Sequence, residues 1–132
     1  MKPWPILVFL SSAAWCQDLD SALTAEQFDA YVTGKTLFWS FEGQAWGTEE
    51  YLPGRLVQWA SQPGECQIGR WYEEAGQICF RYDGGEAPSC WIFRATITGL
   101  TADLQGPKGP FLLQEAGQTD DGLNCPGPAV GV

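Results

Sequence analysis

The sequence lacks histidine altogether, has few basic residues, and has no apolar run long enough to cross a membrane. Without an imidazole, Ser-His-Asp and Cys-His catalysis and the common histidine metal sites are excluded. Seven Lys and Arg residues stand against sixteen Asp and Glu residues, which gives a formal net charge of −9. Binding to nucleic acid depends on basic side chains that neutralise phosphates, so we expect no nucleic-acid partner and no stable membrane insertion.

The N-terminal segment has the layout of a secretory signal peptide. Lys2 supplies a weak positive start and residues 3–14 supply an apolar run, which is shorter than the ~20 residues that a transmembrane helix needs. We expect cleavage between Cys16 and Gln17, where polar sequence begins, although cleavage before Trp15 also fits the small-residue rule. A lipoprotein modified at Cys16 stays open as an alternative, but its signal requires a small residue where Trp15 stands. The mature protein is therefore predicted to be periplasmic or secreted.

Loss of the signal peptide leaves six Lys and Arg against sixteen Asp and Glu, a net charge of −10, and four of the five cysteines. An even number of cysteines in an oxidising compartment predicts two disulfides. Strand parity puts Cys66, Cys79 and Cys90 on the same face of the sheet. Cys79 and Cys90 lie diagonally on adjacent strands, where a small register shift would place them opposite each other, so we favour Cys79–Cys90 with Cys66–Cys125. The pairing Cys66–Cys90 with Cys79–Cys125 is the alternative.

One short helix is predicted near the start of the mature chain. Thr24 and Gln27 have the spacing of a capping box, and Gly34 suits the C-terminal end of a helix. The helix is expected over residues 25–32, with Phe28 on its apolar side.

From Lys35 onward the chain alternates apolar and polar residues between turn signals, which is typical of short antiparallel strands. We expect strands at 35–41, 44–51, 55–60, 65–72, 77–82, 89–97, 99–104 and 111–115. Their spacing predicts an all-β fold, an antiparallel meander closed or half-closed into a small barrel. The expected organisation is a signal peptide (1–16), a single β-rich domain (17–116), and an irregular Gly- and Pro-rich tail (117–132) tethered by Cys125.

The middle of the chain allows a prediction of strand register. If residues 73–76 form a four-residue hairpin loop, Trp71 lies opposite Ile78, and the next loop places Phe80 opposite Trp91. One face of the sheet is then apolar and is expected to form the core. This face carries Trp71, Ile78, Phe80, Trp91, Phe93 and Ala95.

Tryptophans are the candidates for a ligand site. The mature chain keeps five of them, which could line the mouth of a barrel around an apolar or sugar ligand, or could simply fill the core. Trp71 and Trp91 share the predicted core face and favour the second interpretation. Trp46 and Trp59 are the ligand-binding candidates.

The carboxylates give no catalytic pattern. Glu49-Glu50, Glu73-Glu74 and Asp120-Asp121 are adjacent pairs, whereas a glycosidase needs two carboxyl groups facing each other across a cleft. Neighbours on a strand point to opposite faces, and neighbours in a turn usually face solvent. We expect all of these carboxylates to be solvated.

A series of short motifs resembles a group of small secreted proteins of unknown function from alphaproteobacteria. The likeness extends over roughly residues 23–93. It consists of Tyr31 to Leu37 (YVTGKTL), Tyr51 to Arg55 (YLPGR), Cys66-x-x-Gly69-x-Trp71-Tyr72-Glu73, Gly76 to Phe80 (GQICF) and Cys90-Trp91. The resemblance implies export to a bacterial periplasm. It implies no activity, cofactor or site residue.

Together these observations predict a non-enzymatic small-ligand binding or accessory protein that needs no cofactor. Its partner is expected to be a small molecule or an envelope protein. The alternative is a protein-protein interaction or inhibitor module of the cell envelope. A hydrolase that uses carboxylates alone ranks third.

Overall fold

The computed structural model describes residues 1–6, 21–62, 64–85 and 87–125. The expected cleavage site between Cys16 and Gln17 and the end of the expected tail, residues 126–132, lie outside the described residues. Among the residues described, no helix is both long and apolar enough to cross a lipid bilayer.

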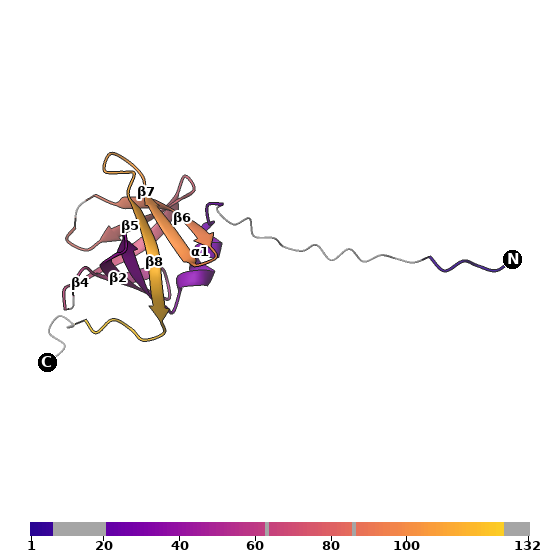
Figure 1. The fold of residues 1–132 in the computed structure, drawn as a ribbon, viewed down its shortest axis with the longest axis horizontal. Coiled ribbons are helices and arrows are strands. Elements are labelled where there is room, and N and C mark those ends of the chain that lie inside the picture. The colour runs from indigo at the N-terminus through magenta and orange to yellow at the C-terminus, as the bar shows by residue number, and fades with distance from the viewer. Residues whose placement is uncertain (7–20, 63, 86, 126–132) are drawn as a thin grey trace.

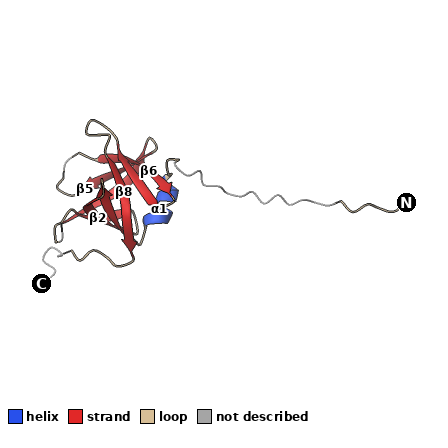
Figure 2. Ribbon diagram, viewed as in Figure 1, coloured by secondary structure: helices blue, strands red, loops and turns tan. Residues whose placement is uncertain are grey.

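The chain forms a closed antiparallel barrel in which every strand pairs with its neighbours in sequence and the last strand returns to the first (Figures 1 and 2). This confirms the all-β fold with one short helix and decides for the closed form of the barrel. The elements are α1 (Ala25–Val32), β1 (Thr36–Phe41), β2 (Gln44–Leu52), β3 (Leu56–Ala60), β4 (Cys66–Glu74), β5 (Gln77–Tyr82), β6 (Ser89–Thr96), β7 (Gly99–Leu104) and β8 (Leu112–Thr119).

Helix α1 begins at the predicted capping box, where the Thr24 hydroxyl accepts from the backbone N–H of Gln27 and the Gln27 side chain accepts from the N–H of Thr24. Its buried side has Phe28 fully enclosed, with its ring edge-on to Trp71 at 5.0 Å between centroids. The backbone N–H of Leu23 also donates to the carbonyl of Phe93 on β6 at 2.8 Å. The helix therefore closes one end of the barrel and completes its apolar core.

A polar contact fixes the outer side of the helix to β8. The Tyr31 hydroxyl donates to Glu115 at 2.8 Å, and Glu115 also accepts from the backbone N–H of Leu100 on β7 at 2.6 Å. Burial and the neighbouring Glu115 carboxylate raise the pKa of Tyr31 to about 12. Glu115 is therefore engaged at the helix-covered end of the barrel.

The predicted core face is the inner face of the barrel. Trp71, Ile78, Phe80 and Phe93 are all less than 5% exposed. The remaining two members of that face, Trp91 and Ala95, are partly buried and pack against this core.

The predicted register along β4 and β5 is wrong by two residues. Trp71 lies opposite Phe80, and Glu74 pairs with Gln77 around a two-residue turn, Ala75-Gly76, in which both residues have positive φ (52° and 77°). This is the geometry of a type I′ turn, whose twist matches that of the strands. Ala75 accepts a conformation that usually favours glycine, so the strands continue further than a four-residue loop would allow. A two-residue slip leaves the inner and outer faces unchanged.

The same kind of shift occurs between β5 and β6, where Ile78 rather than Phe80 lies opposite Trp91. In this register Cys79 lies directly opposite Cys90, with 4.0 Å between their Cα atoms, and the two form a disulfide. The second disulfide joins Cys66 to Cys125 across 59 residues. These are the two pairs favoured from strand parity.

Strand β8 is longer than predicted. It continues to Thr119 and so takes three residues from the segment expected to be irregular from Gly117. The reason is barrel closure: β1 provides a partner for β8 as far as the pair Thr36–Thr119. Beyond it, the backbone N–H of Leu123 donates to Glu50 on the outer face of β2 at 2.6 Å, and Cys125 then reaches Cys66.

Candidate functional site

The end of the barrel opposite the helix contains an open cavity of about 450 Å³. Ligand cavities in proteins commonly measure 300–1,000 Å³ and combine apolar walls with a few polar groups. All eight strands contribute to its lining, which consists of Trp39, Trp46, Glu49, Tyr51, Trp59, Gln67, Phe80, Tyr82, Ser89, Trp91, Phe93, Ala102 and Leu113.

Trp46 and Trp59, the two candidates from the sequence, both line this cavity. Trp46 is 44% exposed, which places it where the cavity meets solvent. Trp59 is partly buried. Ligand binding by these two residues stays a prediction, but the fold does bring them to one cavity. Trp71, in contrast, belongs to the filled core near the helix.

An aromatic cluster forms one side of the opening. Phe111, which lies just before β8, stacks on Phe41 with 4.3 Å between ring centroids and lies 5.0 Å from the ring of Trp46. Trp91 completes the group at 6.5 Å from Phe111. These contacts hold Trp46 against the barrel although much of its surface is exposed.

The expectation that all paired carboxylates are solvated is wrong for Glu49. Its side chain points into the barrel and is only 2% exposed, whereas Glu50 lies on the outer face. Both carboxylate oxygens of Glu49 accept from the Tyr82 hydroxyl, at 2.7 and 3.0 Å. Strand alternation is the physical reason: Glu49 has the same parity as buried Tyr51, so the pattern that buries one buries the other.

Burial dominates the electrostatics of this pair. It raises the pKa of Glu49 well above the ordinary glutamate value of 4.5, and the hydrogen bond from Tyr82 only partly opposes that rise. The pKa values of Tyr82 and Tyr51 are raised as well, first by burial and then by the negative charge of Glu49. No Lys or Arg is among the described residues that line the cavity. Glu49 is thus a buried acid without a basic neighbour in the cavity wall.

Two glycines make room for the site. A Cβ atom on Gly69 would lie 2.6 Å from the carbonyl oxygen of Arg81 and 2.7 Å from the ring of Tyr82. A Cβ atom on Gly47 would collide with the indole ring of Trp59. The absence of side chains at these two positions therefore lets Tyr82 lie across β4 toward Glu49 and lets Trp59 lie across β2.

The cavity offers a single carboxyl group. Among the described lining residues Glu49 is the only acid, and Glu115 is engaged at the opposite end of the barrel. Two-carboxylate glycoside hydrolysis requires a second carboxyl group within about 5–9.5 Å across the cleft. The geometry of these residues therefore gives no support to a hydrolase of that type.

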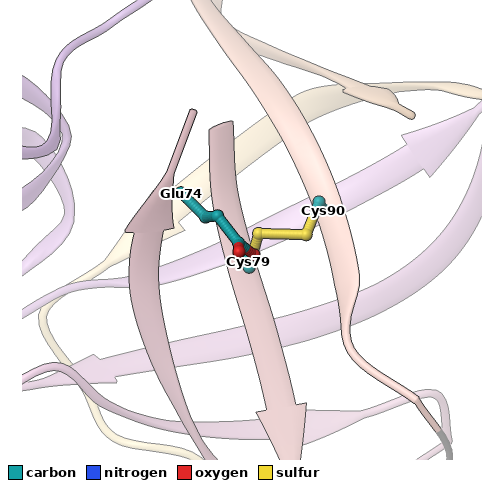
Figure 3. Close-up of side chains that lie close together, drawn as sticks. All are labelled: Glu74, Cys79 and Cys90. Atoms are coloured by element: carbon teal, nitrogen blue, oxygen red, sulfur yellow. A yellow bond between two sulfur atoms is a disulfide. The ribbon is translucent and has the colours of Figure 1, made fainter. Parts of the chain in front are cut away.

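Glu74 lies next to the Cys79–Cys90 disulfide on the outer wall (Figure 3). The three side chains are close enough to hold a metal ion in principle. Zinc and other soft ions bind the thiolate form of cysteine, and the disulfide consumes both thiols. In the oxidised protein this group is a structural crosslink with a neighbouring carboxylate.

No protein-family model matches the chain, and no curated protein or solved structure matches it either. The class of this protein is therefore defined by its fold and its cavity. It is a closed eight-stranded antiparallel β-barrel with one end covered by a helix and the other end open to an aromatic cavity.

Sequence reasoning missed the polar residues of the cavity: Glu49, Gln67, Tyr82 and Ser89. A signal was present for Glu49, which alternates with Tyr51 along a predicted strand. Gly69 was another signal, because a glycine inside a strand often marks a close approach of a neighbouring group.

Proposed function

We propose that this chain is a non-enzymatic binding protein that takes a small ligand into the open end of its barrel. The supporting observation is the cavity of about 450 Å³, with an aromatic wall and one polar pair, Glu49 and Tyr82, inside it. Apolar walls provide affinity by burying ligand surface, and a few fixed polar groups provide orientation. A closed barrel suits this role because its walls are held by hydrogen bonds on both sides of every strand.

The proposal is tested with a neutral apolar fluorophore, N-phenyl-1-naphthylamine, excited at wavelengths where tryptophan does not absorb. Gln67 and Ile68 are adjacent on β4 and give a matched pair of variants. Gln67 lines the cavity, whereas Ile68 is 44% exposed on the outer wall. Gln67→Trp is expected to block the opening and weaken binding about tenfold, a loss of about 1.4 kcal/mol. Ile68→Trp is expected to leave binding unchanged.

Absence of binding to the wild-type protein would contradict the proposal. Equal binding by the wild type and both variants would contradict it too, because the dye would then be bound outside the barrel. Thermal unfolding of each variant verifies that it is folded before the comparison is made.

A second candidate function is binding of a protein partner. A groove of about 630 Å³ lies over β1 and β2 beside the segment that leads to Cys125, and it includes Phe38, which is 42% exposed. Exposed apolar surface of this kind is typical of interaction sites. If the groove binds an envelope protein, Phe38→Ser abolishes that complex and leaves dye binding in the barrel intact.

We also propose that the protein works after export, in a bacterial periplasm or outside the cell, with cleavage between Cys16 and Gln17. Two disulfides support an oxidising compartment. Intact-mass measurement of the exported protein is the test: the mass should correspond to a chain starting at Gln17, and four alkyl groups should add only after reduction. A free thiol before reduction, or a lipid mass on Cys16, would overturn this account.

A further inference from the structure

Among the described residues, Glu49 is a buried acid with no Lys or Arg in the wall of its cavity, and such a group is costly to bury. An isolated buried charge loses its hydration, and structures normally compensate with an ion pair or several hydrogen bonds. Among the described residues, the Tyr82 hydroxyl donates a hydrogen bond to the Glu49 carboxyl group. A carboxylate has about four acceptor positions, so most of its capacity remains available to a ligand in the cavity.

The walls around this carboxylate favour a positive ligand. Trp46, Trp59 and Trp91 line the same cavity as Glu49. The face of an indole ring carries negative charge density and attracts ammonium groups, and tryptophan is the strongest of the aromatic residues in this respect. An aromatic wall and one acid together match an ammonium group attached to an apolar body.

The field of the whole chain acts in the same direction. Sixteen acidic residues stand against seven basic ones. Such an excess of negative charge raises the local concentration of small cations and repels small anions. The absence of Lys and Arg from the described cavity lining removes the usual means of holding a carboxylate or phosphate ligand.

We propose that the ligand is a small organic cation, an amine with a flat apolar body, whose ammonium group binds the Glu49 carboxylate while its body lies among the cavity tryptophans. This inference rests on the function proposed above and narrows it to one class of ligand. A neutral ligand that accepts a hydrogen bond from protonated Glu49 is the competing outcome.

Binding of an amine has a consequence for protons. Because burial raises the pKa of Glu49, the free protein holds a proton there more tightly than an exposed glutamate does, and an ammonium ligand competes with that proton. The titratable groups facing Glu49 are Tyr82 on β5 and its strand neighbour Tyr51 on β2, and raised pKa values keep both uncharged. Affinity for an amine therefore increases as pH rises through the pKa of Glu49, and binding releases a proton to the buffer.

The test uses three probes of nearly equal size and different charge: 2-phenylethylamine, 2-phenylethanol and phenylacetate. Isothermal titration calorimetry from about pH 5 to about pH 9 measures each affinity, and buffers of different ionisation enthalpy report proton release. We expect the amine to bind at least about tenfold more tightly than the alcohol at the upper end of this range, with the acid weakest. The preference should shrink as the pH falls.

Glu49→Gln and Glu50→Gln form a matched pair, since Glu50 is the next residue and lies on the outer wall. Glu49→Gln should remove the preference for the amine and its pH dependence, whereas Glu50→Gln should retain both. The pH profile and proton release of the wild type test the same point without relying on the folding of either variant.

The outcomes separate the two proposals. If N-phenyl-1-naphthylamine enters the cavity but the alcohol or the acid binds as tightly as the amine, the cation inference is wrong and the binding function stands. The inference is also wrong if Glu49→Gln keeps the amine preference. If neither the dye nor any of the three probes binds, both proposals fail.

Discussion

The Tyr82 hydroxyl donates to both carboxylate oxygens of Glu49, at 2.7 and 3.0 Å, and so joins β5 to β2 through the interior of the barrel. The two residues are 33 positions apart in the chain, and neither strand pairs with the other in the sheet. The contact connects opposite parts of the wall just where the apolar core gives way to the cavity. It therefore bears on both stability and ligand binding.

Removing this donor should destabilise the protein. Tyr82→Phe leaves the buried Glu49 carboxyl without its hydrogen bond, and an unsatisfied buried group costs about 1–3 kcal/mol. Chemical denaturation should show a loss of that size in the free energy of unfolding. Tyr72→Phe is the control, because Tyr72 lies on the outer face of β4, and it should change stability by less than about 0.5 kcal/mol. Similar losses of unfolding free energy in both variants would contradict the prediction, because they would show that the hydrogen bond from Tyr82 to Glu49 gives no particular stability.

Glu49 should make stability fall as pH rises. Its pKa in the folded protein lies above the ordinary value of 4.5 that it has in the unfolded chain, so the folded state holds the proton more tightly. The resulting stabilisation of the folded state is fully present at pH values below the unfolded-state pKa of Glu49. It is lost as pH rises through the raised pKa of the folded state. Glu49→Gln should flatten this part of the profile and gain stability relative to wild type at neutral and higher pH. Glu50→Gln should keep the wild-type slope, and an unchanged slope in Glu49→Gln would contradict the prediction.

Gly69 should not tolerate a methyl group. The added Cβ would lie 2.6 Å from the carbonyl oxygen of Arg81, and backbone has little room to move inside a barrel wall. Gly69→Ala should lower the free energy of unfolding by about 1–3 kcal/mol, as overpacking usually does. Gly117→Ala is the matched control, since its nearest neighbour would be the ring of Phe38 at 3.6 Å, an ordinary contact. Equal melting temperatures for the two variants would contradict this prediction, because they would show that the atoms around Gly69 move to accommodate the added methyl group.

The two disulfides should differ in their contribution to stability. Cys66–Cys125 closes a loop of 59 residues and Cys79–Cys90 one of 11. In the chain-entropy model, their removal costs about 4 and about 3 kcal/mol, respectively. Double Cys→Ser variants measured by denaturation test these values. Hydrogen exchange adds a local readout, because loss of Cys66–Cys125 should specifically deprotect the N–H of Leu123, which donates to Glu50. Equal protection in both double variants would show that this segment is held without the disulfide.

The sequence alone determined the local elements of this protein. Capping chemistry placed the helix at Ala25–Val32, and alternation between turn signals placed eight strands close to their final bounds. Both are signals of short range, carried by residues within a few positions of one another. Parity also assigned the inner and outer faces, because a two-residue error in register does not change which face a side chain occupies. It put Cys66, Cys79 and Cys90 on one face and so favoured the observed cysteine pairs, but the choice between the two pairings was made by the register of the folded sheet.

The tertiary structure decided closure and, through it, the site. Pairing of β8 with β1 is a contact between the two ends of the sheet, so it extended β8 beyond the point where local composition becomes Gly-rich. Closure also made one face of the sheet the interior of the barrel. Glu49 became buried because its side chain lies on that face. The meeting of Glu49 with Tyr82 and the tryptophans depends on distances across the barrel. No spacing along the chain encodes such distances, which is why the cavity became visible only in the fold.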